Sequence, residues 1–312
     1  MTRVIFMGAP TFAVPTLEAL VRAGHEIVGV ITQPDKPAGR GLAMTAPPVK
    51  QAAQALGLSV FQPESLRDGA FLAALAATRP DLILVAAYGK YIPQEALALA
   101  PRGSLNLHPS LLPRWRGACP ANAAIVAGDA ETGVTIHFVV DQMDAGDVLA
   151  QRRVPLAPDE TAASLMARLA PLGAELFVAT LNHWLAREVV PQVQDHSQAT
   201  WCDRLKKAQG RLDWALPADA LARQLRAYHP WPGAYTTWQG HNLKILAAHP
   251  LPGGQDHARP GAVLQLADEI AVATGAGALA LDRVQRAGKH PLPAPDFARG
   301  ARGFVGSVLD YP

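Results

Sequence analysis

One short segment of the sequence places an amide and an imidazole side by side. It runs from Gly103 to Pro109 as GSLNLHP, and its apolar residues predict a strand over 104–108. Because side chains alternate between the two faces of a strand, Asn106 and His108 share one face and the leucines share the other. An Asn can stabilise an oxyanion and a His can transfer protons, so the pair could serve acyl transfer. A hydrogen-bonded core pair at a sheet edge is the alternative interpretation.

A second segment, residues 141–147, reads DQMDAGD and forms a turn between two predicted strands, with three carboxylates. Aspartates often cap turns, so the segment taken alone needs no functional explanation. A carboxylate that meets His108 would change that interpretation, because an imidazole and a carboxylate can share a proton-transfer role. Together the two segments could form an acyl-transfer site without a covalent nucleophile.

Other chemistries find less support in the sequence. Gly8 follows the first predicted strand without the three-glycine dinucleotide fingerprint, and the glycines at 275–277 precede a β-like run, which favours a hairpin turn. There is no Walker A sequence and no Gly-x-Ser-x-Gly elbow. The ten histidines show no metal-ligand spacing, so we expect no metal. Only two cysteines, Cys119 and Cys202, occur, which is typical of a reducing compartment without disulfides.

The elements that must position these residues alternate along the first half of the chain. Nearly continuous apolar runs predict strands, and one-sided apolar patterns predict helices between them. Such alternation indicates βαβ units and an open parallel sheet, which binds ligands at the carboxyl ends of its strands. We expect strands over 4–7, 27–32, 81–87 and 104–108, and helices over 15–23, 68–78 and 117–127.

The second half of the chain changes character. Two more strands are expected over 133–140 and 148–154, followed by one long or two shorter helices within 159–187. Residues 187–203 have little periodicity and are expected to form a linker. A helix over 218–227 then precedes short β-like runs separated by Pro and Gly, a pattern typical of a small sandwich or barrel. These runs lie at 235–239, 243–247, 262–266, 270–273 and 278–282.

Composition limits the class of protein. The chain has 312 residues, 49% of them hydrophobic and 17% charged, which predicts two domains with sizeable cores. Residues 204–312 hold 13 Lys and Arg against 8 Asp and Glu, whereas residues 1–203 carry a net charge of −3. The basic part is compatible with a polyanion partner or with an ordinary solvated surface. Neither a signal-peptide pattern nor a membrane-spanning run is found, so we expect a soluble, cytoplasmic protein.

The same residues carry a resemblance to a known family. Residues 106–113, 114–117 and 141–147 resemble the signature of the formyltransferases that use 10-formyltetrahydrofolate. Within this family the chain resembles, from end to end, the branch whose acceptor is methionyl initiator tRNA; further matching segments lie at 4–10, 33–41, 87–90 and 230–233. The resemblance implies an α/β, Rossmann-like catalytic domain with a mostly parallel sheet (1–190), a linker (191–206) and a C-terminal OB-like β-barrel that binds tRNA (207–312).

The resemblance also implies roles for individual residues. Asn106 and protonated His108 would stabilise the oxyanion of the tetrahedral intermediate, and Asp144 would orient His108 and help relay a proton. The formyl group would move from N10 of the folate, the co-substrate, to the α-amino group of methionine on the tRNA. The residues expected to bind or border the folate are Tyr88, Gly89, Ile92, Pro93, Ser110, Leu111, Leu112 and Pro113.

Two basic segments are expected to contact tRNA. Residues 33–50 read as a Pro- and Gly-rich surface loop, and the resemblance implies that this loop meets the acceptor stem through Lys36 and Arg40. A second basic run begins the C-terminal domain, where phosphate contacts and a solvated helix face are both open interpretations. It comprises Arg204, Lys206, Lys207 and Arg211. The expected protein needs no metal or membrane and is a monomer.

Several rival functions deserve comparison. Glycinamide ribonucleotide formyltransferases resemble the N-terminal domain only, so about a hundred further residues count against that function. Formyltransferases that act on nucleotide-linked amino sugars can carry a related second domain, but the basic loop around Arg40 favours tRNA. A non-catalytic RNA-binding protein on an enzyme fold would have no need for Asn106, His108 and Asp144 together. A dehydrogenase would need the missing glycine fingerprint.

Overall fold

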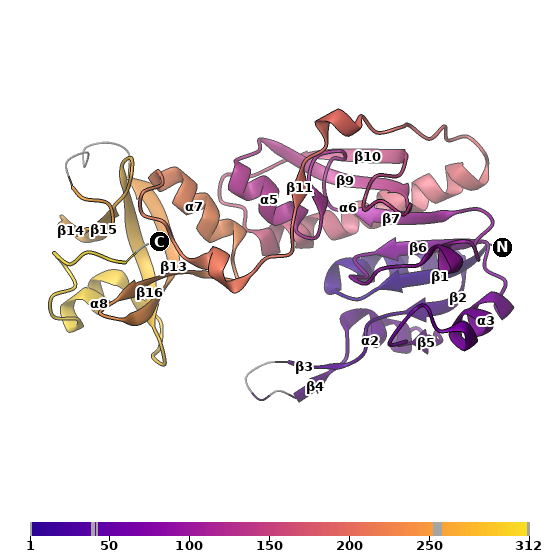
Figure 1. Ribbon diagram of the computed structural model, residues 1–312, viewed down its shortest axis with the longest axis horizontal. Coiled ribbons are helices and arrows are strands. Elements are labelled where there is room, and N and C mark those ends of the chain that lie inside the picture. The colour runs from indigo at the N-terminus through magenta and orange to yellow at the C-terminus, as the bar shows by residue number, and fades with distance from the viewer. Residues whose placement is uncertain (1, 39–40, 42, 252–257, 311–312) are drawn as a thin grey trace. The chain divides into compact units, whose positions relative to one another are not determined.

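The computed structural model describes residues 2–38, 41, 43–251 and 258–310. Its residues cluster into two compact units, each described here by itself (Figure 1). The N-terminal unit comprises Met1–Pro120, Glu131–Pro155 and Leu165–Asp203. The C-terminal unit comprises Ala121–Ala130, Leu156–Ser164 and Arg204–Pro312.

A seven-stranded sheet forms the centre of the N-terminal unit, with strand order β10-β9-β7-β6-β1-β2-β5. Five strands run parallel: β1 (Arg3–Gly8), β2 (Glu26–Ile31), β5 (Val60–Phe61), β6 (Leu82–Ala86) and β7 (Ser104–His108). Two antiparallel strands, β9 (Glu131–Phe138) and β10 (Val148–Pro155), complete the edge beside β7. The expected α/β fold with a mostly parallel sheet is therefore confirmed. Among the seven strands of this sheet, β5 is the one without a counterpart among the expected strands.

Burial on both faces explains the continuous apolar runs of the central strands. All of Val4, Ile5, Phe6 and Met7 in β1 are fully buried, as parallel strands covered by helices require. The helices and short 3-10 turn of this unit are η1 (Thr11–Ala13), α1 (Val14–Arg22), α2 (Pro48–Ala55), α3 (Gly69–Ala77), α4 (Gln94–Leu97) and α6 (Ala162–Leu185).

The segment over 159–187, for which one or two helices were expected, forms the single helix α6. Its 24 residues have a mean hydropathy of 1.3 in their most apolar stretch, so by length and composition α6 could span a membrane. This corrects the expectation that no run is long and apolar enough. In the fold, however, α6 buries Leu165 and Phe177 completely. A Cβ on Gly173 would lie 2.8 Å from Leu107 of β7, so the helix packs directly on the sheet.

Two local features differ from the expected elements. The expected loop after residue 33 contains a small hairpin, in which β3 (Lys36–Ala38) pairs with β4 (Ala43–Thr45). The helix expected over 117–127 begins only at Pro120, as α5 (Pro120–Ala127). Gly117 instead belongs to β8 (Arg116–Gly117), which pairs with β11 (Trp201–Cys202) about eighty residues later. That pairing is a long-range contact, which a helical pattern in the local sequence cannot reveal.

The C-terminal unit contains the expected antiparallel β structure. Its sheet has the order β12-β13-β16-β15-β14, and β17 pairs with β16. Bridges from Thr237 to Asp310 and from Ala262 to Val308 connect the C-terminal tail to both ends of this sheet. The strands are β12 (Ala234–Trp238), β13 (His241–Leu251), β14 (Val263–Leu266), β15 (Glu269–Ala273), β16 (Ala278–Arg286) and β17 (Leu292–Pro293); helices are α7 (Ala218–Ala227) and α8 (Ala294–Gly300).

Candidate active site

Strand register brings the first site residues together at the carboxyl end of β7. Asn106 pairs with His137 of antiparallel β9, and His108 is the next residue of β7 on the same face. The Asn106 amide nitrogen lies 3.0 Å from His137 Nε2. The pairing of β7 with β9 therefore adds a second imidazole to the two residues expected from the sequence.

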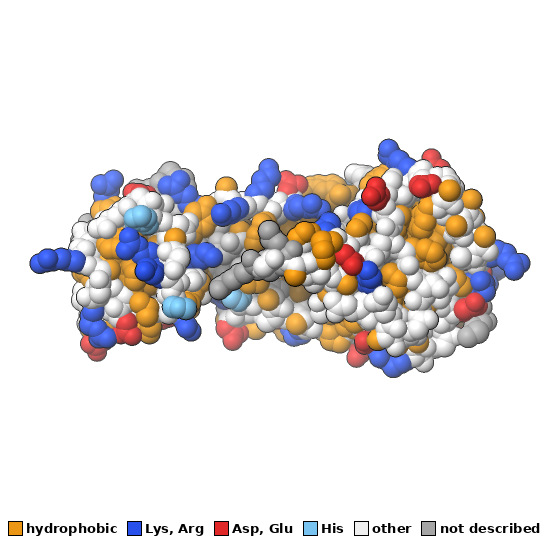
Figure 2. Space-filling model, turned by 90° about the horizontal axis from the view of Figure 1, so that it is seen from below, with side chains coloured by type: hydrophobic (Ala, Val, Ile, Leu, Met, Phe, Trp, Pro, Cys, Tyr) orange, Lys and Arg blue, Asp and Glu red, His pale blue; other side chains and the backbone are white. Residues whose placement is uncertain are grey.

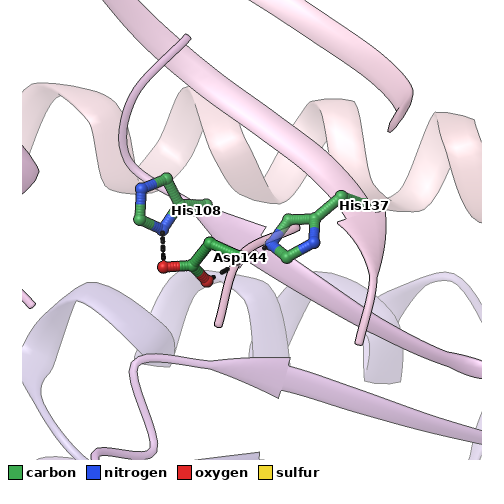
Figure 3. A group of neighbouring side chains, drawn as sticks. All are labelled: His108, His137 and Asp144. Atoms are coloured by element: carbon green, nitrogen blue, oxygen red, sulfur yellow. Dashed lines mark ion pairs between the residues drawn. The ribbon is translucent and has the colours of Figure 1, made fainter. Parts of the chain in front are cut away.

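Asp144 completes the cluster from the loop between β9 and β10. Its carboxylate lies between the two imidazoles (Figure 3), 3.6 Å from His108 Nδ1 and 3.6 Å from His137 Nε2. The backbone N–H of Gly117 donates a hydrogen bond of 2.8 Å to Asp144 Oδ2. The structure thus brings Asn106, His108 and Asp144 into one group at the sheet edge where such folds bind ligands.

The loop reaches this position through an unusual backbone. Asp144 has a φ of +52°, a left-handed conformation that costs a residue with a Cβ about 1–2 kcal/mol. Gly146 follows where only glycine fits, because an added Cβ would lie 2.0 Å from the Phe138 carbonyl oxygen. A strained aspartate held among buried histidines is an arrangement found at functional sites more often than in ordinary turns.

His137 is a neutral acceptor in this cluster. Its Nδ1 lies 2.8 Å from the Phe138 carbonyl oxygen, which can only accept, so Nδ1 carries the hydrogen. Nε2 is then free to accept from the Asn106 amide. Burial lowers the pKa of His137 to about 4, although the nearby Asp144 carboxylate acts in the opposite direction. His137 therefore fixes the amide orientation of Asn106 and remains uncharged at neutral pH.

His108 has an acceptor for each of its ring nitrogens. Nε2 lies 2.9 Å from the Trp115 carbonyl oxygen, so it must carry a hydrogen, and Nδ1 faces Asp144. The side chain is only 4% exposed. An imidazolium at this position could therefore donate to both partners, and a neutral ring would keep Nδ1 available as a base.

The geometry suits the stabilisation of an oxyanion. An amide has two N–H donors, and Asn106 uses one for His137, which leaves the other for a substrate oxygen. The Asp144 carboxylate lies beside His108 Nδ1 and can hold the imidazole in one orientation. Together these groups can stabilise negative charge on a carbonyl oxygen and move a proton, the two requirements of acyl transfer between nitrogen atoms.

The cluster also has the residue types of a metal site. One ligand atom from each of His108, His137 and Asp144 lies within 4.8 Å of the others. The sequence showed no such spacing, because the three residues come from β7, β9 and a loop. In the described structure His137 Nε2 already accepts from Asn106, and Asp144 Oδ2 already accepts from Gly117. A metal ion would have to displace the Asn106 amide to bind His137.

The residues expected to border the folate lie near the same sheet edge, but several contribute only backbone. Tyr88 is 2% exposed and packs in the core with Ile5 and Met7. Its neighbour Gly89 is exposed with a φ of +76°. Pro93 is buried and Ile92 half-buried. The half-buried side chain of Ile92 is therefore accessible to a ligand, whereas the buried side chain of Tyr88 is not.

The second expected folate segment, residues 110–113, is held firmly beside β9. Ser110 is completely buried, and its hydroxyl donates to the Arg114 carbonyl oxygen at 2.6 Å. The Leu112 N–H donates to Thr135 Oγ1, and its carbonyl oxygen accepts from Gln151. Leu111 and Pro113 are half-buried.

The expected tRNA-contacting residues fall into two groups. Lys36 begins β3, is exposed, and donates to Gln33 Oε1 at 3.0 Å. Arg40 lies outside the described residues. The C-terminal unit shows Lys and Arg side chains on its surface (Figure 2). In its basic run, Arg204, Lys206 and Lys207 are exposed and Arg211 is half-buried, and no ion pair of these four side chains occurs within the described ranges.

Three residues near the site were not expected from the sequence. His137 could have been found only from the register of β9 against β7. Arg116 is buried, and its guanidinium donates to Gln194 Oε1 at 2.7 Å and to His196 Nδ1 at 2.9 Å. Burial lowers the pKa of Arg116, and the Asp144 carboxylate partly offsets this. No local sequence signal marks Gln194, because its partners Asp144, Gly146 and Arg116 lie 48 to 78 residues away.

Comparisons with known proteins identify the family of the chain. Residues 2–181 match the family model described as formyl transferase, and residues 204–302 match the formyl transferase C-terminal domain. The methionyl-tRNA formyltransferase of Roseiflexus castenholzii is 51% identical over 308 residues, which cover 98% of each chain. That of Thiobacillus denitrificans is 50% identical over 309 residues, 98% of this chain and 99% of the relative.

Solved structures show the same fold at lower identity. HypX from Aquifex aeolicus in complex with tetrahydrofolic acid has a TM-score of 0.64 and 21% identity; the match covers 99% of this chain but 51% of HypX. An N-formyltransferase from Helicobacter canadensis, with folinic acid and dTDP-3-aminofucose, has a TM-score of 0.66 and 15% identity, with coverage of 92% and 100%. With full-length identity near one half and both family models matched in order, the chain belongs to the methionyl-tRNA formyltransferase family.

Proposed function

We propose that this protein transfers the formyl group of 10-formyltetrahydrofolate to the α-amino group of methionyl initiator tRNA, for translation initiation. The observation that carries the proposal is the cluster of Asn106, His108 and Asp144 in a chain 51% identical over its length to a methionyl-tRNA formyltransferase. The cluster supplies the chemistry, and the full-length relationship supplies the acceptor.

The reaction follows from the groups in the cluster. The methionyl amine attacks the formyl carbon, and a new C–N bond forms as the carbonyl oxygen becomes an oxyanion. The free N–H of Asn106 and protonated His108 stabilise that oxyanion. As the intermediate collapses and the bond to N10 breaks, His108, which Asp144 orients, gives its proton to N10. The proton lost by the amine then restores the imidazolium. No covalent enzyme intermediate is needed.

The donor would bind at the carboxyl ends of β6 and β7. The exposed backbone at Gly89, the side chain of Ile92 and the segment 110–113 border this edge. The solved relative with tetrahydrofolic acid supports a folate in this fold. The proposed donor site uses no metal, since the hydrogen bonds described above already engage His137 and Asp144.

The acceptor would bind through the two basic segments. Lys36 and Arg40 would meet the acceptor stem, and Arg204, Lys206, Lys207 and Arg211 of the C-terminal unit would contact phosphates. Four cations without ion pairs in the described structure are well suited to a polyanion. The proposed enzyme acts as a monomer in the cytoplasm, where translation begins.

A second acceptor is worth testing because the fold is shared with sugar N-formyltransferases, one of which was solved with dTDP-3-aminofucose. The protein is mixed with 10-formyltetrahydrofolate and either methionyl initiator tRNA or a nucleotide-linked amino sugar, and formylated product is measured. The proposal predicts transfer to the tRNA and none to the sugar. Transfer to the sugar alone would keep the formyltransferase chemistry and refute the acceptor.

A further inference from the structure

The segment that follows α6 makes side-chain contacts with the catalytic loops. Residues 187–203 contain only the turn η2 (His196–Gln198) and the short strand β11. Within them, residues 194–202, here called the strap, bond to loops at 113–118 and 144–146. Gln194 lies at its start and is 5% exposed, although most of its neighbours are exposed.

The Gln194 amide makes four contacts whose directions are fixed by chemistry. Nε2 donates to the carbonyl oxygens of Asp144, at 2.9 Å, and Gly146, at 2.7 Å. Oε1 accepts from the Arg116 guanidinium, at 3.2 Å from Nε and 2.7 Å from Nη2. Since carbonyl oxygens only accept and a guanidinium only donates, a single orientation of the amide satisfies all four contacts.

The backbone conformation of Asp144 requires stabilising contacts. Its left-handed backbone is unfavourable and must be stabilised by surrounding contacts. In the described loop between β9 and β10, one backbone bond joins the Ala145 N–H to the Gln142 carbonyl oxygen at 3.2 Å, and at its base the Phe138 N–H donates to the Asp147 carbonyl oxygen. Gln194 holds the carbonyl groups on both sides of Ala145, in the conformation that points the Asp144 carboxylate at His108 Nδ1.

The other end of the strap supports His108. The Trp115 N–H donates to Thr200 Oγ1 at 2.9 Å, and the Arg116 N–H donates to the Thr200 carbonyl oxygen at 2.8 Å. The Cys202 thiol, whose pKa burial raises to about 11, lies 3.3 Å from the Arg116 carbonyl oxygen. These contacts fix the Trp115 carbonyl group, which accepts the hydrogen bond of His108 Nε2.

We propose that Gln194 is a positioning residue for formyl transfer, acting through Asp144, and that Thr200 supports His108 through Trp115. The inference rests on the proposed function for the reaction that is measured. Gln194 donates to the Asp144 loop and accepts from Arg116, the neighbour of Trp115. The proposal assigns its effect to the Asp144 loop, whose carboxylate faces His108. A displacement of the carboxylate would slow the chemical step and leave substrate affinity unchanged.

The test compares variants of the full-length protein in single-turnover formyl transfer to methionyl initiator tRNA. Gln194→Glu keeps an acceptor for Arg116 but replaces the N–H donors with an oxygen that faces two carbonyl oxygens. We expect its maximal rate to fall by about 100-fold, with half-saturating concentrations of both substrates within about 2-fold of wild type. Gln198→Ala is the matched control, because this exposed strap glutamine bonds only to Asp195, and it should transfer at the wild-type rate.

A second variant protects the test against a folding defect. Thr200→Val keeps the side-chain shape but removes the acceptor of the Trp115 N–H, and we expect about a 10-fold lower rate with unchanged half-saturation. Tm measurements confirm that each variant is folded. Gln194→Glu is then repeated in an Asp144→Asn background, where a residue that acts through Asp144 should cause no further loss.

The outcomes are separable. Wild-type rates in both folded strap variants would overturn the proposal, as would an equal fold-loss from Gln194→Glu with and without the Asp144 carboxylate. Raised half-saturation at an unchanged maximal rate would also overturn it, because that result indicates a binding role. Failure of the wild-type protein to formylate the tRNA would refute the proposed function instead.

Discussion

Strand β7 and the strap hold the same proposed catalytic group, Asn106, His108 and Asp144, by different means. β7 lies between two neighbouring strands, and its backbone ladder sets the positions of Asn106 and His108. The strap has the two-residue pairing of β8 with β11 and a backbone bond from the Thr200 N–H to the Pro113 carbonyl oxygen, and its contacts with the Asp144 loop come from the Gln194 side chain. The backbone hydrogen bonds of β7 are distributed over many residues, whereas a single substitution can remove the Gln194 side-chain amide. The comparison teaches that catalytic geometry here depends on both a rigid strand and a few replaceable hydrogen bonds.

The largest effect is expected on the β7 side of this comparison. His108→Ala removes both the oxyanion-stabilising charge and the proton-transfer group, so we expect kcat to fall at least about 1000-fold. Binding of methionyl initiator tRNA, measured by filter retention, should stay nearly unchanged. A loss smaller than that of Gln194→Glu would reverse the order of importance assigned to strand and strap.

The next effect concerns the free energy of unfolding and its dependence on His137, the buried hydrogen-bond partner of Asn106. The pKa of His137 rises from about 4 in the folded protein to its ordinary value of 6.5 on unfolding. Between these values the unfolded state binds more protons, so the free energy of unfolding falls as pH drops from 6.5 towards 4, by up to about 1.4 kcal/mol per pH unit. His137→Gln should flatten this dependence. Urea unfolding at several pH values measures it, and equal slopes in both proteins would contradict a neutral buried His137.

A smaller effect is expected just beyond the strap, in the basic run. The double variant Lys206→Ala and Lys207→Ala should weaken tRNA binding several-fold and reduce the salt dependence of binding, because each phosphate contact contributes to that slope. The single-turnover rate at saturating tRNA should not change. A lower saturating rate would mean that the basic run, like the strap, supports the chemistry.

The smallest effect is expected from metal removal. Extensive treatment with a chelator should leave the transfer rate unchanged, because His137 and Asp144 are engaged by hydrogen bonds to Asn106 and Gly117. The assay is repeated after adding back Zn²⁺. Loss of activity on chelation and recovery with Zn²⁺ would show that the three-residue cluster holds a metal.

Elements with a strong local pattern could be predicted from the sequence. Continuous apolar runs marked β1, β6 and β7, and the alternation in β7 placed Asn106 and His108 on one face. The resemblance supplied Asp144, which the pattern of turn residues alone did not single out. The strand predictions were confirmed because burial and alternation of side chains are visible as patterns in adjacent residues.

The rest of the site depends on contacts between distant segments. His137 joins the site through the antiparallel register of β9 on β7, and Gln194 through hydrogen bonds to residues fifty positions earlier. Neither contact produces periodicity in the sequence. Similarly, β8 and β11 are two residues each and are defined only by their pairing with one another. Residues 187–203 therefore look like a linker in the sequence, although they contain the strap that contacts the proposed catalytic group.

The most direct test of the account measures single-turnover formyl transfer from 10-formyltetrahydrofolate to methionyl initiator tRNA by wild type and Asp144→Ala. The account predicts rapid transfer by wild type and a loss of at least about 1000-fold in the variant, with folate binding retained. Comparable rates in the two proteins would contradict the assignment of Asp144 and, with it, the catalytic cluster.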